Sequence, residues 1–412
     1  MSPRDIPAEY QPAPPVSAVE PRQARPPITL LVAMSGLGPF TMQIIIPVMP
    51  ALAAALAVPY ATAQLTLTLY LLGVSLGQLL YGPLSDRFGR KPLLLAGLGL
   101  FLAGSALAAA APNATVLILA RVIQAVGGCS GLVLGRAMIR DVWPRDRAAS
   151  VMGYVSTAMA VAPMLAPLLG SLLAGWFGWR ATMLACLGFG LPLLLLVRRF
   201  MPETLRQPAA LPGLGGMVGA YGQLLRLPAF RAYGMLLAGS TGVFFSFAAG
   251  APLVVVGHMG HAATTYATCF MLVSIGWSAG TFTTARFATR YGLFRLMALG
   301  IGVTTLGAAM AVLGQWLLPP GLLAVFLPMV VVAWGNGMTQ PNAMAAAVSV
   351  RPQLAGTASG LMGAAQMGFG ALMTLVAGML ETGSGMATAL LMLACALGTQ
   401  AALLAVRRLR SP

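Results

Sequence analysis

Acidic residues are scarce in this chain. Its 412 residues include 8 Asp and Glu against 24 Lys and Arg, and only 8% of all residues are charged. Soluble globular domains are about 25% charged, and a chain that is 58% hydrophobic has too little polar surface to cover a water-facing exterior. Disorder is excluded as well, because disordered segments are poor in apolar residues. We therefore expect the chain to lie in a lipid bilayer.

Several classes of function need features that the sequence lacks. A nucleic-acid-binding protein gathers its cations on one face, whereas here they occur singly or in small groups between apolar runs, so we expect no nucleic-acid partner. The sequence has no clustered metal ligands, no nucleophile beside a base and no GxxxxGK[ST] loop for nucleotide phosphates. The four cysteines lie in apolar stretches and are typical of buried hydrophobic residues. We predict neither an enzyme nor a bound metal or cofactor.

Long apolar runs, in contrast, are abundant. A spanning helix needs about 20 apolar residues, and turn-forming residues such as Pro319-Pro320-Gly321 separate such runs. The proline-rich residues 1–27 have no apolar core and are predicted to be a disordered cytoplasmic tail, not a cleavable signal. We predict twelve transmembrane helices, at 28–50, 62–83, 93–111, 115–138, 148–172, 181–198, 231–254, 264–284, 293–315, 321–345, 355–380 and 386–406.

The cations predict the orientation of these helices. If both tails and the even-numbered connections lie on one side, that side carries 22 of the 24 Lys and Arg, with Arg180 opposite and Arg121 inside a helix. Lys and Arg accumulate in the cytoplasmic loops of membrane proteins, so we predict that both termini are cytoplasmic. We expect a monomeric, multi-pass membrane protein.

The longest polar connection divides the chain into two halves of six helices. Arg87-Phe88-Gly89 follows the second predicted helix, and Arg290-Tyr291-Gly292 follows the eighth, 203 residues later. A duplicated six-helix unit is the expected plan of a transporter that works by a rocking motion. We predict an all-α integral membrane fold with pseudo-symmetric bundles at 28–198 and 231–406, a central cytoplasmic linker at 199–230 and a cytoplasmic tail at 407–412.

The segment GPLSDRFGRKP, at 82–92, resembles the loop signature of the major facilitator superfamily. In that family the loop acts as a latch between the two halves and stabilises the outward-facing state. The resemblance assigns this role to Gly82, Asp86, Arg87, Gly89, Arg90 and Lys91. By chemistry alone, Gly82 permits a close helix approach, Asp86 can accept from a neighbouring helix N-terminus, and the cations can pair with Asp141 or Asp146. The alternative is a set of solvated cations on the cytoplasmic face.

Further segments resemble the drug-antiporter branch of that superfamily. Residues 121–128 resemble its arginine motif, and the segment containing Pro163, Pro167 and Gly170 resembles its antiporter motif. RAMIRDVW at 136–143 and GNGMTQPNAMAAA at 335–347 are similar to the Bcr/CflA drug-resistance transporters. The resemblance implies a multidrug or small-molecule efflux transporter that works by alternating access, with a proton gradient as its energy source. A metabolite exporter or uncoupled carrier of the same fold is the alternative.

Arg121 is a cation inside a predicted span. Such a residue normally faces protein or an aqueous interior, and helical spacing places Gln124, Gly128, Gly131 and Gly135 on the same face. The resemblance implies that Arg121 lies near the substrate cavity and takes part in proton coupling. The alternative is a structural cation that backbone carbonyls satisfy or that extends toward the membrane surface.

Gln43 departs from the family's pattern, because many Bcr/CflA-like chains carry an acid there. An amide cannot bind and release a proton near physiological pH, and no Asp or Glu of this sequence is predicted deep in the membrane. A cavity without an acid should hold neutral, zwitterionic or anionic amphiphiles better than lipophilic cations. Proton coupling is either absent or uses one of the remaining candidates, Glu381, His258, His261 or Arg121.

Uncharged polar residues in the predicted spans are further cavity candidates. An apolar pocket with a few polar groups suits a broad-specificity binder, and the chain's 25 methionines can adapt to varied ligands. Besides Gln43 and Gln124, the candidates are Tyr70, Tyr154, Asn336, Gln340, Asn342 and Gln366. Each could instead form hydrogen bonds between helices. We expect Phe244, Phe245 and Phe247 to serve packing or lipid contact, and Pro163, Pro167 and Gly170 to mark a helix bend and contact.

Overall fold

The computed structural model describes residues 25–159, 161–205 and 214–410, and this part of the chain is helical with short connections. Most of the predicted N-terminal tail therefore lies outside the described residues, as do 206–213 of the linker and the last two residues. The elements are α1 (Ile28–Gln43), η1 (Ile46–Val48), α2 (Met49–Ala55), α3 (Tyr60–Phe88), α4 (Arg90–Ala109), α5 (Ala114–Val142), α6 (Arg145–Met159), α7 (Val161–Phe177), α8 (Arg180–Phe200), α9 (Leu214–Leu225), α10 (Pro228–Pro252), η2 (Leu253–His258), α11 (Ala263–Tyr291), α12 (Leu293–Leu317), α13 (Leu322–Ser349), η3 (Pro352–Leu354), α14 (Ala355–Leu380) and α15 (Met386–Arg410).

The prediction of twelve membrane helices is confirmed. Eleven helical segments in the described ranges are long and apolar enough to cross a membrane. In this set α1, η1 and α2 together form the first span, α6 and α7 form the fifth, and α10 continues into η2 as the seventh. The twelfth helix is α11, whose 29 residues include Arg286 and Arg290 and which packs on α13 and α7.

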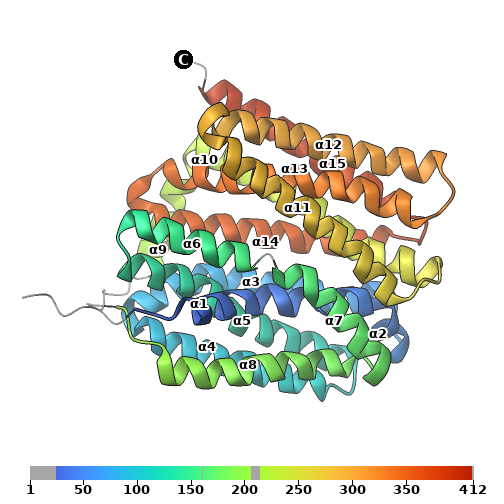
Figure 1. Ribbon diagram of the computed structural model, residues 1–412, viewed down its shortest axis with the longest axis horizontal. Coiled ribbons are helices and arrows are strands. Elements are labelled where there is room, and N and C mark those ends of the chain that lie inside the picture. Colours follow the sequence, from blue (N-terminus) through green and yellow to red (C-terminus); the bar gives the residue numbers. More distant parts are fainter. Residues whose placement is uncertain (1–24, 160, 206–213, 411–412) are drawn as a thin grey trace, which may run out of the picture.

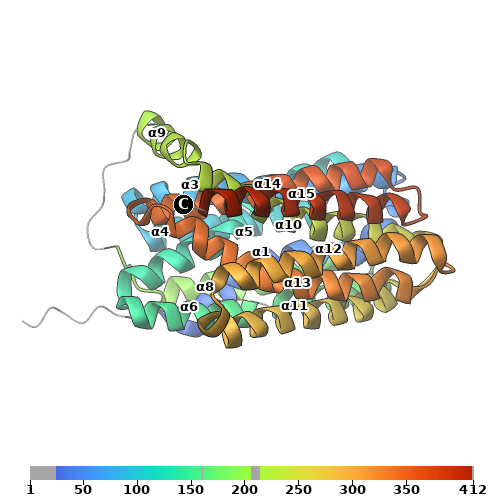
Figure 2. The same ribbon diagram turned by 90° about the horizontal axis from the view of Figure 1, so that it is seen from above.

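The twelve helices form two bundles that lie side by side (Figure 1). The first bundle contains α1 to α8 and the second contains α10 to α15, while α9 lies on the outside of both (Figure 2). Across the boundary, α3 packs along α14. The hydroxyl oxygens of Thr68 and Thr374 are 2.8 Å apart there, and Ser75 Oγ donates to the Ala364 carbonyl at 2.8 Å. This helix pair joins the bundles along their length.

The repeat in the sequence is also a repeat of structure. Both α3 and α11 have 29 residues, and both ends of α11 follow the corresponding ends of α3 by 203 residues. Each helix ends at a glycine with positive φ, Gly89 at 94° and Gly292 at 80°, and the next helix starts directly after it. An L-residue with a side chain rarely adopts this conformation, so glycine makes the sharp turn in both halves.

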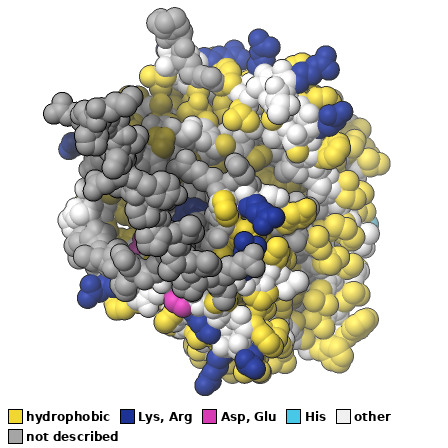
Figure 3. Space-filling view, turned by 60° about the vertical axis from the view of Figure 1, so that its left-hand side comes forward, with side chains coloured by type: hydrophobic (Ala, Val, Ile, Leu, Met, Phe, Trp, Pro, Cys, Tyr) yellow, Lys and Arg dark blue, Asp and Glu magenta, His cyan; other side chains and the backbone are white. Residues whose placement is uncertain are grey.

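The two ends of the bundles differ in charge. At one end, here called the basic end, the described cations include Arg87, Lys91, Arg140, Arg198, Arg226, Arg290, Arg351 and Arg407. Figure 3 shows dark blue side chains spread over this face. The opposite end, here called the distal end, carries the turns at Pro59, Asn113 and Gly383. This separation agrees with the predicted topology of the connections.

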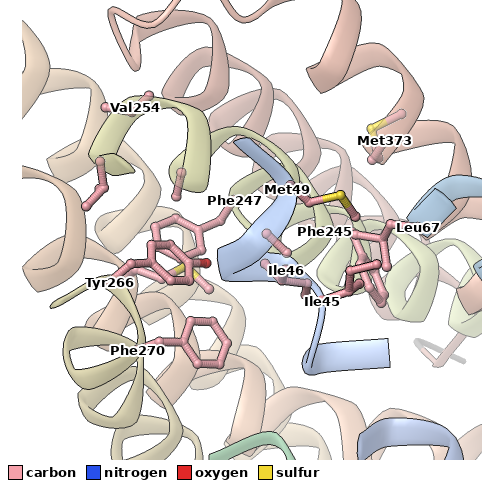
Figure 4. Close-up of a cluster of buried hydrophobic side chains, with 14 of the residues drawn as sticks. Ile45, Ile46, Met49, Leu67, Phe245, Phe247, Val254, Tyr266, Phe270 and Met373 are labelled. Carbon is pink, nitrogen blue, oxygen red and sulfur yellow. The ribbon is translucent and has the colours of Figure 1, made fainter. Parts of the chain in front are cut away.

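Three clusters of buried apolar side chains form the core. One lies in the first bundle and includes Tyr70 and Phe101. A second lies in the second bundle toward the basic end and includes Phe230. The third, here called the shared cluster, contains side chains of both bundles, among them Ile45, Ile46, Met49, Leu67, Phe245, Phe247, Tyr266 and Phe270 (Figure 4). The bundles therefore have a common core on the distal side and separate cores toward the basic end.

Two regions differ from the predicted helices. The first span, expected to be continuous over 28–50, breaks after Gln43 into a 3-10 turn, because Pro47 and Pro50 lack the N–H donors that a continuing α-helix needs. The predicted central linker contains α9, which Tyr221 ties to α3 by donating to the Leu79 carbonyl at 3.1 Å. Leu224, also on α9, is buried in the cluster of the second bundle.

Candidate functional site

A cavity of about 290 Å³, here called the central cavity, lies between the two bundles beside the shared cluster. The first bundle lines it with Pro39, Met42, Gln43 and Pro163, and the second with Thr241, Phe244, Phe245, Phe270, Val273, Ser274, Trp277, Ala333, Gln340 and Met367. None of these side chains is charged. Because both bundles contribute, relative motion of the bundles changes the shape of the cavity.

A few polar groups are placed on this apolar wall. Gln43 is buried, and its Oε1 atom has no hydrogen-bond partner among the described residues. Thr241 Oγ1 accepts from Gln366 Nε2 at 3.2 Å and from Gln340 Nε2 at 3.4 Å. Of the residues predicted from the sequence, Gln43 and Gln340 thus line the cavity. Gln366 forms a hydrogen bond to Thr241, which lines it. Thr241 and Ser274 were missed, because threonine and serine are common in these helices.

Aromatic side chains form much of the second bundle's contribution. Phe244 and Phe245 meet edge to face at 5.2 Å between ring centres, and Phe244 and Phe270 at 6.2 Å. Phe245 is buried in the shared cluster and Phe244 packs against it, so the expected packing is confirmed, and both rings also line the cavity. Phe247 does pack in the core, 5.8 Å from the Phe326 ring centre. An aromatic wall suits flat apolar ligands, whose position a few polar groups then fix.

Arg121 is fully buried in the first bundle. Its guanidinium carbon lies 4.2 Å from the Tyr70 ring centre, and Nη1 donates to Gln124 Oε1 at 2.6 Å and to the Thr41 carbonyl at 3.2 Å. Gln124 Nε2 donates in turn to Ser105 Oγ at 2.7 Å. A desolvated cation over an aromatic face gains roughly 2 kcal/mol. Thr41 is two residues from Gln43, so this network holds the helix that lines the cavity.

The network leaves part of Arg121 unused. Its Nε and Nη2 atoms have no hydrogen-bond partner in the described part of the chain. One carbonyl and one amide thus compensate the burial of a full charge only in part, which is costly for a purely structural cation. Arg121 itself does not line the cavity.

At the basic end, Arg90, the first residue of α4, connects the end of α3 to α5. Its Nη1 atom pairs with Asp86 Oδ1 at 2.6 Å and also contacts Ser85 Oγ, while Nε pairs with Asp141 Oδ2 at 2.9 Å. Thr204 Oγ1 donates to the same Asp141 oxygen at 3.2 Å. The expected pairing of a cation with Asp141 is thus found for Arg90.

Other members of the expected latch behave differently. Arg87 lies over the Phe88 ring, 5.9 Å from its centre, and within the described residues neither Arg87 nor Lys91 forms an ion pair. A Cβ atom at Gly82 would meet no atom within 4 Å, so the close helix approach expected there is not made in this conformation. The side chain of Asp146, another expected partner, lies outside the described part.

Glu203, just after α8, caps the start of α4. Its Oε1 and Oε2 atoms accept the backbone N–H groups of Arg90 and Lys91 at 3.0 Å each. Oε1 also accepts from the N–H groups of Thr204 and Leu205 at 2.8 Å. A carboxylate at a helix N-terminus stabilises the helix by about 0.3–1 kcal/mol or more. We had expected Asp86 to accept from a helix N-terminus, but Asp86 pairs with Arg90 and Glu203 has that role.

The sequence matches a known protein family over most of its length. Residues 31–375 match the family described as Major Facilitator Superfamily. The chain belongs to the Major Facilitator Superfamily. The resemblance of its motifs to this family is confirmed.

Several relatives of this facilitator are named for drug resistance. It is 31% identical over 361 residues to "Bicyclomycin resistance protein homolog" of Haemophilus influenzae, which covers 85% of this chain and 89% of the relative. It is 33% identical over 331 residues to "Chloramphenicol resistance protein" of Pseudomonas aeruginosa, covering 79% and 75%. "Multidrug resistance protein D" of Escherichia coli is 29% identical over 359 residues, covering 87% and 90%. The Bcr/CflA-like assignment is thereby confirmed.

Solved structures confirm the fold of this facilitator. A bacterial homolog of the human lysosomal transporter Spinster has a TM-score of 0.72 at 17% identity, with 92% of this chain and 96% of that chain covered. The xylose transporter of E. coli has a TM-score of 0.71 at 16% identity, with 93% and 98% covered. At such identities the likeness concerns the arrangement of the twelve helices.

Several predicted cavity residues of this facilitator lie elsewhere. Asn336 accepts from Ser240 Oγ at 2.6 Å and is fully buried between helices. Asn342 donates to the Met338 carbonyl at 2.7 Å, and Tyr70 is buried beneath Arg121. Tyr154, on α6, is 67% exposed and does not line the central cavity. The alternative interpretation, hydrogen bonding between helices, describes both asparagines, since Asn342 also donates to Thr284 Oγ1 of α11 at 3.4 Å.

The antiporter-motif helix α7 contacts both the cavity and α1. Pro163, in its first turn, lines the central cavity, and Pro167 is buried inside the helix. A Cβ atom at Gly170 would overlap the carbonyl oxygen of Ile44, next to the break in the first span. The expectation of a close helix contact at Gly170 is confirmed.

The remaining candidates for proton coupling lie away from the cavity. Glu381, just after α14, accepts from the backbone N–H groups of Gly383, Gly385 and Thr388 at 2.8–3.1 Å and from the Thr388 hydroxyl. Its carboxylate thus organises the turn into α15. His258 is exposed, and its Nδ1 atom lies 3.1 Å from the Leu253 carbonyl oxygen, while His261 is partly exposed in the turn before α11.

Proposed function

We propose that this chain exports drug-like small molecules across a bacterial inner membrane by alternating access. The observation that carries the proposal is the central cavity, which lies between the bundles and combines aromatic, methionine and amide side chains without a charge. This chemistry suits varied apolar ligands. The resistance names of relatives that match most of the chain support drug-like substrates. The chain acts as a transporter, without enzymatic activity, as a monomer in the bilayer.

The basic end is cytoplasmic in this proposal, since Lys and Arg accumulate on that side. Both termini and the linker that contains α9 then lie in the cytoplasm. We infer an inward-facing conformation, in which the shared cluster closes the distal side and the other two clusters each belong to one bundle, while α3 and α14 stay in contact along their length. The bundles at 28–198 and 231–406 are the two moving units. Arg90, Asp86, Asp141 and Glu203 order the part of the first bundle that docks on the second when the basic end closes.

The energy source in this proposal is the proton gradient, with no cofactor. Arg121 is the residue most suited to report on coupling, because it is buried, incompletely bonded and attached to the helix that lines the cavity. An uncoupled carrier is the second candidate. This alternative is supported by the lining of the cavity, which includes none of the carboxylates whose side chains are described. These are Asp86, Asp141, Glu203 and Glu381.

Substrate export and its coupling can be tested separately. A hypersensitive bacterial host that expresses the chain is screened for growth protection against neutral, zwitterionic, anionic and cationic drugs. Protection should be lost with Arg121→Ala at unchanged membrane abundance, and protection against no drug in the panel would contradict drug export. Substrates from the screen are then followed in inside-out vesicles with an imposed pH gradient. A transport rate that ignores the gradient would replace proton antiport with the uncoupled carrier.

A further inference from the structure

A second cavity, here called the vestibule, lies at the basic end and has a volume of about 380 Å³. Both bundles line it, the first through α3 and α5 and the second through the start of α14. The linker helix α9 lines it with Met217 and Tyr221. Burial raises the pKa of Tyr221 above its usual value near 10, so its phenol stays protonated and donates to α3.

Two arginines dominate the charge of the vestibule. Arg136 and Arg140 are one helical turn apart on α5, both line the cavity, and both are exposed to it. Within the described ranges neither side chain has a hydrogen bond or an ion pair. Asp141 follows Arg140 directly but is bonded to Arg90 and Thr204. Among the lining residues the other charges are Arg90 and Asp86. Arg90 pairs with both Asp86 and Asp141, so these three groups together carry one negative charge, and the two arginines leave the vestibule positive.

The start of α14 completes a positive surface on the opposite wall. No side chain caps this helix at Leu354, and its first turn contains no acid. A Cβ atom at Gly356 would lie 3.8 Å from Arg140 Nη1, so the arginine is beside the first turn of α14. Thr357 and Ser359 add hydroxyl groups to the lining. A helix N-terminus carries a partial positive charge, which favours an anion at the same place as the two arginines.

We propose that the vestibule is a binding site for an oxyanion carried on a small organic group, such as a glycerophosphate, held between Arg136, Arg140 and the start of α14. Arginine binds phosphate and carboxylate oxygens through paired N–H groups. The volume lies within the range of about 300–1,000 Å³ that is typical of sites for small organic ligands, and Leu79, Val133 and Met217 offer apolar contact to the organic part. The site is separate from the uncharged central cavity. Its occupant touches both bundles and should stabilise the conformation described here.

The ligand can come from the membrane, as an anionic lipid headgroup, or from the cytoplasm, as a soluble organic phosphate. Purified full-length protein in mild detergent is therefore titrated in two arms, one with phosphatidylglycerol and one with glycerol 3-phosphate, with zwitterionic phosphatidylcholine as comparator. Binding is followed by native mass spectrometry and by the rise in unfolding temperature. Binding in the first arm alone assigns the site to lipid, and binding in the second arm identifies a soluble anion.

Matched variants decide whether the vestibule is responsible. Arg136→Gln with Arg140→Gln should weaken binding at least about tenfold, as the loss of a charge-assisted hydrogen bond requires. Arg198→Gln with Arg295→Gln removes two exposed cations outside the vestibule and should leave affinity unchanged. The double Arg→Lys variant at 136 and 140 keeps the charge but loses the paired N–H groups, so its affinity should lie between those of the wild type and the Gln double variant. No binding to the wild type in either arm, or equal loss in both Gln double variants, would overturn the proposal.

Discussion

No described side chain that lines the central cavity is charged, so Gln43→Glu is the most informative substitution. Gln43 is buried in the wall of the cavity, and its Oε1 atom is without a hydrogen-bond partner among the described residues. Glutamate has nearly the same shape, so the substitution changes charge with little change in packing. We expect the variant to export permanent lipophilic cations that the wild type exports poorly.

The size of the effect follows from Coulomb's law. A cation bound about 5 Å from the new carboxylate gains about 3 kcal/mol at an effective dielectric constant of about 20, which corresponds to about 100-fold in affinity. Desolvation of the carboxylate in a mostly apolar cavity opposes this gain. We therefore expect an increase of about tenfold in transport of the cation relative to a neutral substrate. The carboxylate is charged only above its pKa, so the preference should decline as the pH falls through that pKa.

Transport of tetraphenylphosphonium and of a neutral substrate from the growth screen is measured in inside-out vesicles at two pH values. Gln223→Glu, on the exposed face of α9, adds the same charge outside the cavity and should leave the ratio unchanged. Gln43→Leu separates loss of the amide from gain of charge. A cation-to-neutral ratio that stays at the wild-type value in Gln43→Glu would contradict this expectation, as would a wild-type protein that already prefers the cation.

Three further substitutions test the supporting structure. Arg121→Met should leave the unfolding free energy within about 2 kcal/mol of wild type, since the lost hydrogen bonds are offset by relief of charge burial. Export into vesicles should nevertheless fall at least tenfold, and unchanged export would make the residue purely structural. Gly131→Ala should destabilise by about 1–3 kcal/mol in thermal unfolding, because a Cβ there overlaps the Met34 carbonyl, whereas Gly99→Ala meets nothing within 4 Å and should not destabilise. Glu203→Gln should lower the unfolding free energy by about 1 kcal/mol through weaker capping of α4; no shift in the melting profile would contradict the capping role.

Much of the fold follows from the sequence because the bilayer restricts the possibilities. Spans must be helical and about 20 residues long, so apolar runs and their breaks gave twelve helices. The repeat around Arg87 and Arg290 matched two helices of equal length. The helix ends were harder to predict, since Arg-bearing ends such as Asp86 to Phe88 look like loop yet continue the helix. The break after Gln43 was missed because Pro47 and Pro50 can also stand inside a kinked helix.

The site was predicted less completely, for a physical reason. Polar residues in apolar helices stand out in a sequence, so Gln43, Gln340 and Gln366 were recognised. Apolar side chains that line a cavity have the same sequence pattern as those that pack or face lipid, so Phe244 and Trp277 could not be separated from their neighbours. Contacts between distant segments carry no local signal either. The capping of α4 by Glu203, more than 100 residues further along the chain, is of this kind.

The break in the first span places three parts of the proposed mechanism within six residues. The Thr41 carbonyl accepts from Arg121, Gln43 lines the central cavity, and Ile45 and Ile46 belong to the shared cluster that closes the distal side. The α-helical hydrogen bonds end at Ile44, between the cavity and the cluster, and a 3-10 turn follows. The backbone can therefore turn there without unwinding a whole helix, as hinges at element ends do. A ligand that shifts Gln43 therefore acts on the segment 41–46. Arg121 is bonded to the start of this segment, and the shared cluster packs against its end. Such a connection between cavity and closure requires no carboxylate in the transport path.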